Sequence, residues 1–77
     1  MRYRVQFEGV IGDYSNWYTF YDGYKYFKKW AVVMAYDKYR YLEKDYPHVR
    51  GVRVWDSKKK IEVMRLTYPE PSATIDS

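Results

Sequence analysis

The chain has 77 residues, a formal net charge of +4 and no cysteine, and 22% of its residues are aromatic. A core of this size is only marginally sufficient, and without cysteine no disulfide or thiolate zinc site can stabilise it. We therefore expect a core built from large rings. The longest apolar run, Trp30 to Ala35, is far shorter than the roughly 20 residues of a membrane span, and no signal-peptide pattern opens the chain. These features predict a soluble, cytoplasmic protein with no membrane partner.

Residues 2–8 alternate between apolar and polar side chains, with Tyr3, Val5 and Phe7 on one side. Alternation of this kind predicts a strand that is covered on one face. The aromatic run 17–21 is a second candidate strand, although Thr19 could instead cap the start of a helix. We favour the strand, which gives the element order ββαββ, with βαββ as the alternative.

A helix is predicted from about Gly23 to Asp45, with Asp22 as its N-cap and Pro47 as its stop. A rotation of about 100° per residue gathers most of its large apolar side chains on one arc, which we expect to face the core. That arc contains Phe27, Trp30, Ala31, Met34, Tyr41 and Leu42, flanked by Tyr24 and Ala35.

Residues 49–55 and 61–68 are rich in β-branched and aromatic side chains, and they predict two antiparallel strands joined by a loop at 56–59. The predicted fold is therefore α+β, a small antiparallel sheet of three to four strands packed on one face by a long central helix. We expect residues 1–68 to form a single domain and residues 69–77 to be a flexible C-terminal tail.

The outer face of the predicted helix is less polar than an ordinary solvated face. Tyrosine and arginine are enriched at the energetic centres of interfaces, and lysine usually stays at the rim. We interpret this face as a protein-binding surface; the alternative is that strands or loops of the same chain cover it. Its members are Lys25, Tyr26, Lys29, Val32, Val33, Tyr36, Tyr39 and Arg40.

A second basic set lies on the predicted strands and in the last hairpin loop. On the sheet face opposite the helix, guanidinium and indole groups would form a platform of the kind that binds single-stranded nucleic acid. The alternative is an ordinary charged surface, with the lysines discouraging edge-to-edge pairing of strands. The set comprises Arg2, Arg4, Arg53, Trp55, Lys58, Lys59, Lys60 and Arg65.

Catalytic and cofactor motifs are not visible in the sequence. His48 is the sole histidine, so we expect no transition-metal site. The serines fall outside any nucleophile-elbow pattern, and the glycines form no phosphate-binding loop. We therefore expect a non-enzyme with no catalytic residues, no metal and no cofactor.

In composition the chain resembles small accessory proteins of bacteriophages, being short, basic, free of cysteine and rich in tyrosine. That resemblance implies a protein that binds, and inhibits or redirects, a host protein; it is compositional and assigns no site. Our first hypothesis is protein binding through the outer helix face, with self-association there as a variant. The second is a small basic nucleic-acid-binding protein. The third is a structural subunit that assembles with copies of itself.

Overall fold

The computed structural model describes residues 1–45 and 48–69, without the side chains of residues 43–45. Two strands precede a helix and two strands follow it, so the favoured order ββαββ is confirmed. The elements are β1 (Tyr3–Ile11), β2 (Tyr14–Lys25), α1 (Lys28–Asp45), β3 (Val49–Asp56) and β4 (Ile61–Thr67).

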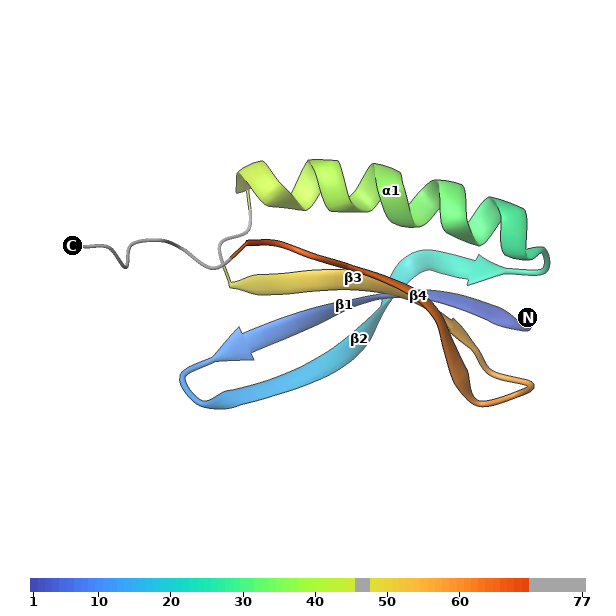
Figure 1. Ribbon diagram of the computed structural model, residues 1–77, viewed down its shortest axis with the longest axis horizontal. Helices are drawn as coiled ribbons and strands as arrows, with labels where there is room; N and C mark the ends of the chain where they lie inside the picture. The colour runs from blue at the N-terminus through green and yellow to red at the C-terminus, as the bar shows by residue number, and fades with distance from the viewer. Residues whose placement is uncertain (46–47, 70–77) are drawn as a thin grey trace.

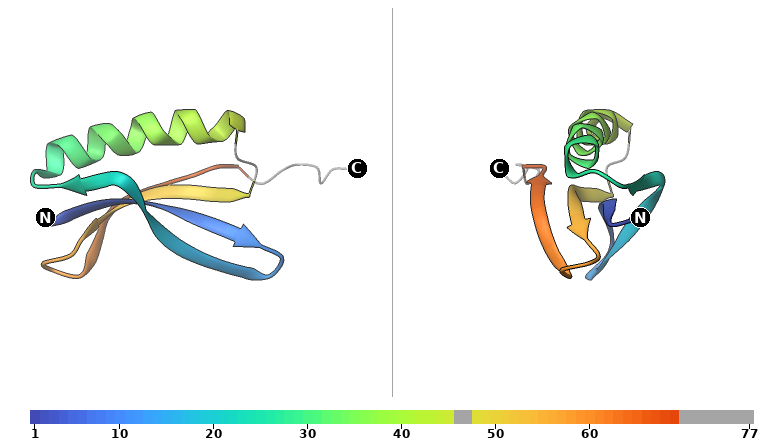
Figure 2. Two further views of the ribbon diagram at one scale, coloured as in Figure 1. Left: turned by 180° about the vertical axis from the view of Figure 1, so that it is seen from behind. Right: turned by 90° about the vertical axis from the view of Figure 1, so that its right-hand side faces the viewer.

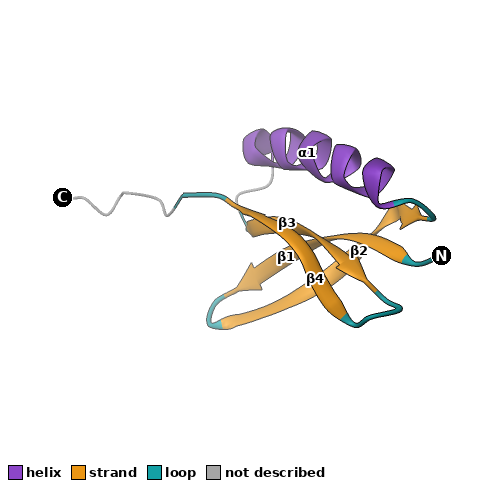
Figure 3. Ribbon diagram, turned by 45° about the vertical axis from the view of Figure 1, so that its right-hand side comes forward, coloured by secondary structure: helices purple, strands orange, loops and turns teal. Residues whose placement is uncertain are grey.

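The strands form one four-stranded sheet in the order β2-β1-β3-β4, in which all neighbours are antiparallel (Figures 1 and 3). Helix α1 lies along one face of this twisted sheet and leaves the other face uncovered (Figure 2). The predicted α+β fold is therefore confirmed. The start of α1, the N-terminus and the β3–β4 turn lie at one end of the molecule, and the β1–β2 turn lies at the other (Figure 1).

The fully buried core is small and aliphatic, which differs from the expected core of large rings. Val5, Val52 and Val54 contribute from β1 and β3, and Ala31, Ala35 and Leu42 contribute from α1. Half-buried rings, such as Phe7 and Phe20, surround this centre. Valine and alanine fill the centre because little room remains where the helix lies close to the strands.

The helix begins at Lys28, so its predicted start at Gly23 and the predicted N-cap Asp22 are wrong. Strand β2 continues through this segment, and it carries extra residues between the pairs Gln6–Thr19 and Arg4–Tyr24. At Gly23 an added Cβ would lie 2.6 Å from the Val5 carbonyl oxygen, so only glycine allows this close approach. The irregularity redirects the end of β2 toward the helix (Figure 1).

The predicted core face of α1 is confirmed for Ala31 and Leu42 but is wrong for its largest rings. Phe27, Trp30 and Tyr41 are 67%, 57% and 58% exposed. The buried stripe consists of Ala31 and Leu42 together with Ala35, which the prediction placed at the edge of the core face. Small side chains allow the helix to approach the strands closely, and the large rings are left on the flank.

The end of α1 at Asp45 agrees with the prediction. Its expected stop, Pro47, and all but the first residue of the expected tail at 69–77 lie outside the described residues. Within the described part of the chain, no helix has both the length and the apolar character needed to cross a membrane.

Candidate functional site: an aromatic groove beside the start of the helix

A groove with a cavity volume of about 970 Å³ lies between the end of β2 and the first four turns of α1. Most of the side chains around it are aromatic or aliphatic. The lining residues are Met1, Asp22, Tyr24, Lys25, Tyr26, Phe27, Trp30, Val33, Met34, Asp37, Lys38 and Tyr41.

Large apolar side chains in this groove remain in contact with solvent. Trp30 is 57% exposed at the start of the helix, and Tyr26 and Phe27 in the preceding loop are 69% and 67% exposed. Tyr41 and Val33 extend the surface along α1 at 58% and 47%. Contiguous exposed apolar surface of this kind commonly marks a binding site.

One ion pair fastens the end of β2 to the helix. The Lys38 Nζ lies 3.2 Å from an Asp22 carboxylate oxygen, and the same ammonium group lies 4.9 Å from the centroid of the Phe20 ring. The hydrogen bond from Lys38 lowers the pKa of the Asp22 carboxyl group. This pair connects the end of β2 to α1 across the groove.

The remaining charges around the groove are not balanced. Asp37 is 3.9 Å from Arg40, so both aspartates of the lining have cationic neighbours. Among the described side chains, Lys25, Lys28 and Lys29 form no ion pair. The Lys29 ammonium group instead lies 5.7 Å from the Trp30 ring centroid. The rim near the helix start is therefore basic.

The structure separates the eight residues predicted as a protein-binding face. Lys25, Tyr26 and Val33 line the groove, and Lys29 lies beside it against Trp30. Tyr36 and Arg40 are exposed elsewhere on α1.

Val32 and Tyr39 are half-buried against the core, so their expected position on the open face of the helix is wrong. The Tyr39 ring stacks on Tyr68 with 4.4 Å between centroids. The sequence prediction assigned four groove residues to the core; Met34 packs against it, whereas Phe27, Trp30 and Tyr41 are exposed. Recognising Ala31 and Ala35 as the close-packing stripe would have placed them outside.

The uncovered sheet face brings Arg53 and Trp55 of the predicted basic set together, and the structure adds Trp17 to them. On the uncovered face the Arg53 guanidinium lies 4.2 Å from the Trp17 ring centroid and 4.6 Å from that of Trp55. Arg53 Nε donates to Gln6 at 2.8 Å, and an Arg53 terminal nitrogen lies 3.7 Å from Glu62. Burial lowers the pKa of Arg53, whose side chain is only 15% exposed. This guanidinium is occupied within the chain.

Two further arginines of that set also lie beside rings on or near the same face, and the buried Nε of Arg4 has no hydrogen-bond partner among the described residues. Arg65 donates to Glu62 at 2.7 Å and lies 5.1 Å from the Trp17 ring centroid. Arg4 lies 5.7 Å from the Tyr24 ring centroid. The uncovered face therefore carries a network of cations and rings rather than open stacking surfaces.

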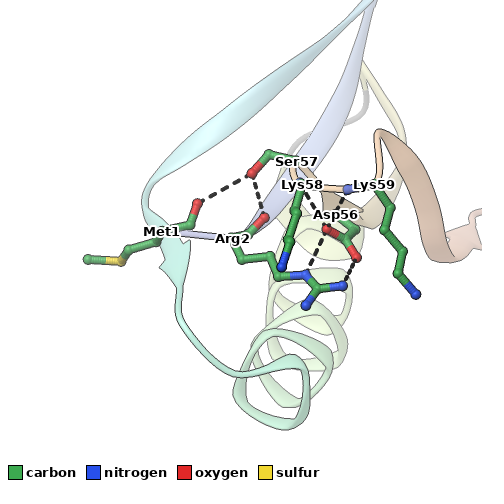
Figure 4. Close-up of polar contacts among 6 residues, drawn as sticks. All are labelled: Met1, Arg2, Asp56, Ser57, Lys58 and Lys59. Atoms are coloured by element: carbon green, nitrogen blue, oxygen red, sulfur yellow. Dashed lines mark hydrogen bonds and ion pairs between the residues drawn. The ribbon is translucent and has the colours of Figure 1, made fainter.

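The last members of the predicted basic set surround Asp56 at the β3–β4 turn (Figure 4). Arg2 donates two hydrogen bonds to the Asp56 carboxylate, at 3.0 and 2.8 Å, and the backbone N–H groups of Lys58 and Lys59 donate to it as well. Asp56 is buried, and the hydrogen bonds from Arg2 hold its pKa well below the usual range. Arg2 is thus a structural residue, whereas Lys58, Lys59 and Lys60 are exposed.

No cluster of three or more metal-ligating side chains occurs among the residues that the structure describes. No protein-family model, curated protein or solved structure matches this chain. The inference of function therefore depends on the groove and the sheet face themselves.

Proposed function

We propose that this protein is a small, non-catalytic binding module that engages a partner protein through the aromatic groove, and that it inhibits or redirects that partner by occupying its surface. The observation that carries the proposal is the exposure of Trp30, at 57%, in the middle of a groove lined by other exposed rings. Tryptophan and tyrosine are the residues most enriched at the energetic centres of protein interfaces.

The size of the exposed surface supports a macromolecular partner. With about 150 to 250 Å² for each large ring, the exposed parts of the groove's five rings amount to roughly 600 Å². A standard interface buries about 800 Å² on each partner. The groove could thus supply most of one side of such an interface. A small-molecule site would bury 70–90% of its ligand, which a groove this open to solvent does not favour.

The charge arrangement favours protein over nucleic acid as the partner. The groove lining contains Asp22 and Asp37 as well as Lys25 and Lys38, whereas a phosphate backbone needs a consistently positive track. On the sheet face, the Arg53 guanidinium already contacts the rings of both Trp17 and Trp55.

The test is affinity capture from a bacterial lysate with and without nuclease, using the wild type, Trp30→Ser and Tyr14→Ser. Tyr14 is the matched control because it is 63% exposed but lies at the β1–β2 turn, at the other end of the molecule. We expect a nuclease-resistant, stoichiometric partner that the Tyr14 variant retains. Trp30→Ser should weaken binding by roughly 30-fold or more, corresponding to the ~2 kcal/mol of a hot-spot residue.

Capture that is insensitive to Trp30→Ser, or that disappears with nuclease, would contradict the proposal. Sedimentation of the purified protein distinguishes the remaining alternative. A dimer that Trp30→Ser converts to a monomer would show that the groove serves self-assembly instead.

A further inference from the structure

We infer that the groove takes an acidic peptide segment of the partner that carries a large apolar anchor, an inference that rests on the proposed function. The anchor would enter between Trp30 and the end of β2, and the carboxylates would face the lysines at the rim. The inference depends on which charges near the groove already have partners and which do not.

The rim has unsatisfied positive charge on one side. Asp22 and Asp37 are paired with Lys38 and Arg40. Lys25 lines the groove and, besides the hydrogen bond from Lys38, helps to lower the pKa of the Asp22 carboxyl group. It forms no ion pair among the described side chains, and the adjacent Lys28 and Lys29 also lack one. Complementary charge mainly sets specificity and association rate. An acidic segment would therefore be favoured over a basic one.

The position of two of these lysines is unfavourable for the isolated helix. Lys28 and Lys29 are the first two residues of α1, and its first turn contains no acidic residue. The N-terminus of a helix carries partial positive charge, so cations there reduce helix stability. A segment that brings carboxylates to this end would relieve the repulsion. Together with the apolar groove, this arrangement suits an acidic chain with an anchor better than a neutral one.

A peptide fits the mixed surface better than an oligonucleotide does. Met1, Val33 and Met34 are aliphatic parts of the lining, and they offer good contact to leucine or aromatic side chains but little to phosphate. The lining has two aspartates and two lysines, so the formal charges of its side chains sum to zero. A peptide can place its carboxylates at the rim alone, whereas each nucleotide carries a charge.

The experiment selects a library of randomised short peptides on the immobilised full chain, in parallel with the Trp30→Ser variant. Sequences enriched on the wild type but not on the variant are the groove ligands. We expect them to be rich in Asp and Glu and to contain at least one aromatic residue or leucine. A selected peptide should shift the Trp30 indole N–H signal in a ¹H–¹⁵N spectrum and leave the Trp17 and Trp55 signals in place.

The outcomes separate this inference from the proposed function. Trp30-dependent peptides that are neutral or basic would overturn the acidic preference and leave the proposed function standing. No Trp30-dependent enrichment would contradict both. Binding of single-stranded oligothymidylate at the same indole, as tightly as the best peptide, would overturn the choice of a peptide as the occupant.

Charge reversal at the rim then tests the lysines directly. Lys25→Glu and Lys29→Glu should each weaken the selected acidic peptide by about tenfold, with a loss that shrinks at high salt. Lys60→Glu is the control, because it changes the net charge equally at the β3–β4 turn, outside the groove lining. An equal loss in the Lys60 variant would assign the effect to net charge and overturn the inference.

Discussion

Two regions of this molecule place aromatic rings beside cations, and they differ in whether the chain itself satisfies those groups. On the uncovered sheet face, Arg53 lies between two indoles and interacts with Gln6 and Glu62. In the groove, the exposed Lys29 lies 5.7 Å from the Trp30 ring centroid, and Trp30 remains 57% exposed to solvent. Similar residue types therefore have a structural role in one region and are available for binding in the other.

This difference shows that counting tyrosines, tryptophans and basic residues is not enough to identify a binding surface. A cation packed between rings and hydrogen-bonded within the chain stabilises the fold, because its desolvation is already compensated. Exposed rings beside unpaired lysines have no such internal compensation. We expect variants in the two regions to separate stability from binding.

The largest effect should come from breaking the sheet-face network. Arg53→Ala removes a guanidinium held by two rings and a hydrogen bond to Gln6, and we expect the free energy of unfolding to fall by about 2 to 4 kcal/mol. Denaturant unfolding measures this change. Partner binding through the groove should be unchanged once the variant is folded. A loss of less than about 0.5 kcal/mol, the size of an ordinary surface substitution, would show that the network is not structural.

The next largest effect is on the pH dependence of the free energy of unfolding, to which Asp56 contributes. Because hydrogen bonds from Arg2 depress the pKa of Asp56 in the folded state, its ionised form stabilises the protein above the usual carboxyl pKa of about 4. That contribution is lost as the pH falls from there toward the folded-state pKa. Asp56→Asn should therefore be less stable than wild type at neutral pH, and the difference should narrow in acid. Unfolding curves at several pH values test this, and a constant difference would contradict it.

The smallest expected change in stability comes from Lys29→Glu, which should stabilise the fold but weaken binding. Lys29→Glu places a carboxylate near the positive end of the α1 dipole, and we expect it to raise the free energy of unfolding by about 0.5 to 1 kcal/mol. The same change should weaken an acidic partner. Thermal unfolding of the variant checks the first part, and a fall in stability would show that Lys29 contributes to the fold through Trp30.

The sequence was sufficient to predict the strands, their antiparallel fold class and the end of the helix. Alternation around Val5 and the β-branched runs near Val52 and Val54 indicate buried strand faces, since burial imposes a period of two. Capping residues gave the wrong start for the helix, because Asp22 and Gly23, which have the character of a helix start, belong to an irregular part of β2. That irregularity depends on the close approach of Gly23 to the Val5 carbonyl, which only the tertiary structure shows.

The candidate site was predicted less well than the fold. Hydrophobic periodicity favours the largest side chains for the core, and it therefore placed Trp30 inside and Val32 outside. In the structure, Ala31 and Ala35 lie at the interface with the sheet, because the short distance between the helix and the sheet limits the size of the side chains there. The role of Trp17 beside Arg53 was also missed, since it depends on the pairing of distant strands.

The most direct test of this account measures the solvent exposure of the three indole groups in the free protein. A soluble paramagnetic agent broadens ¹H–¹⁵N signals according to their access to solvent. We predict strong broadening for Trp30 and much weaker broadening for Trp17 and Trp55. A Trp30 signal as protected as the other two would contradict the central claim that Trp30 lies in an open groove.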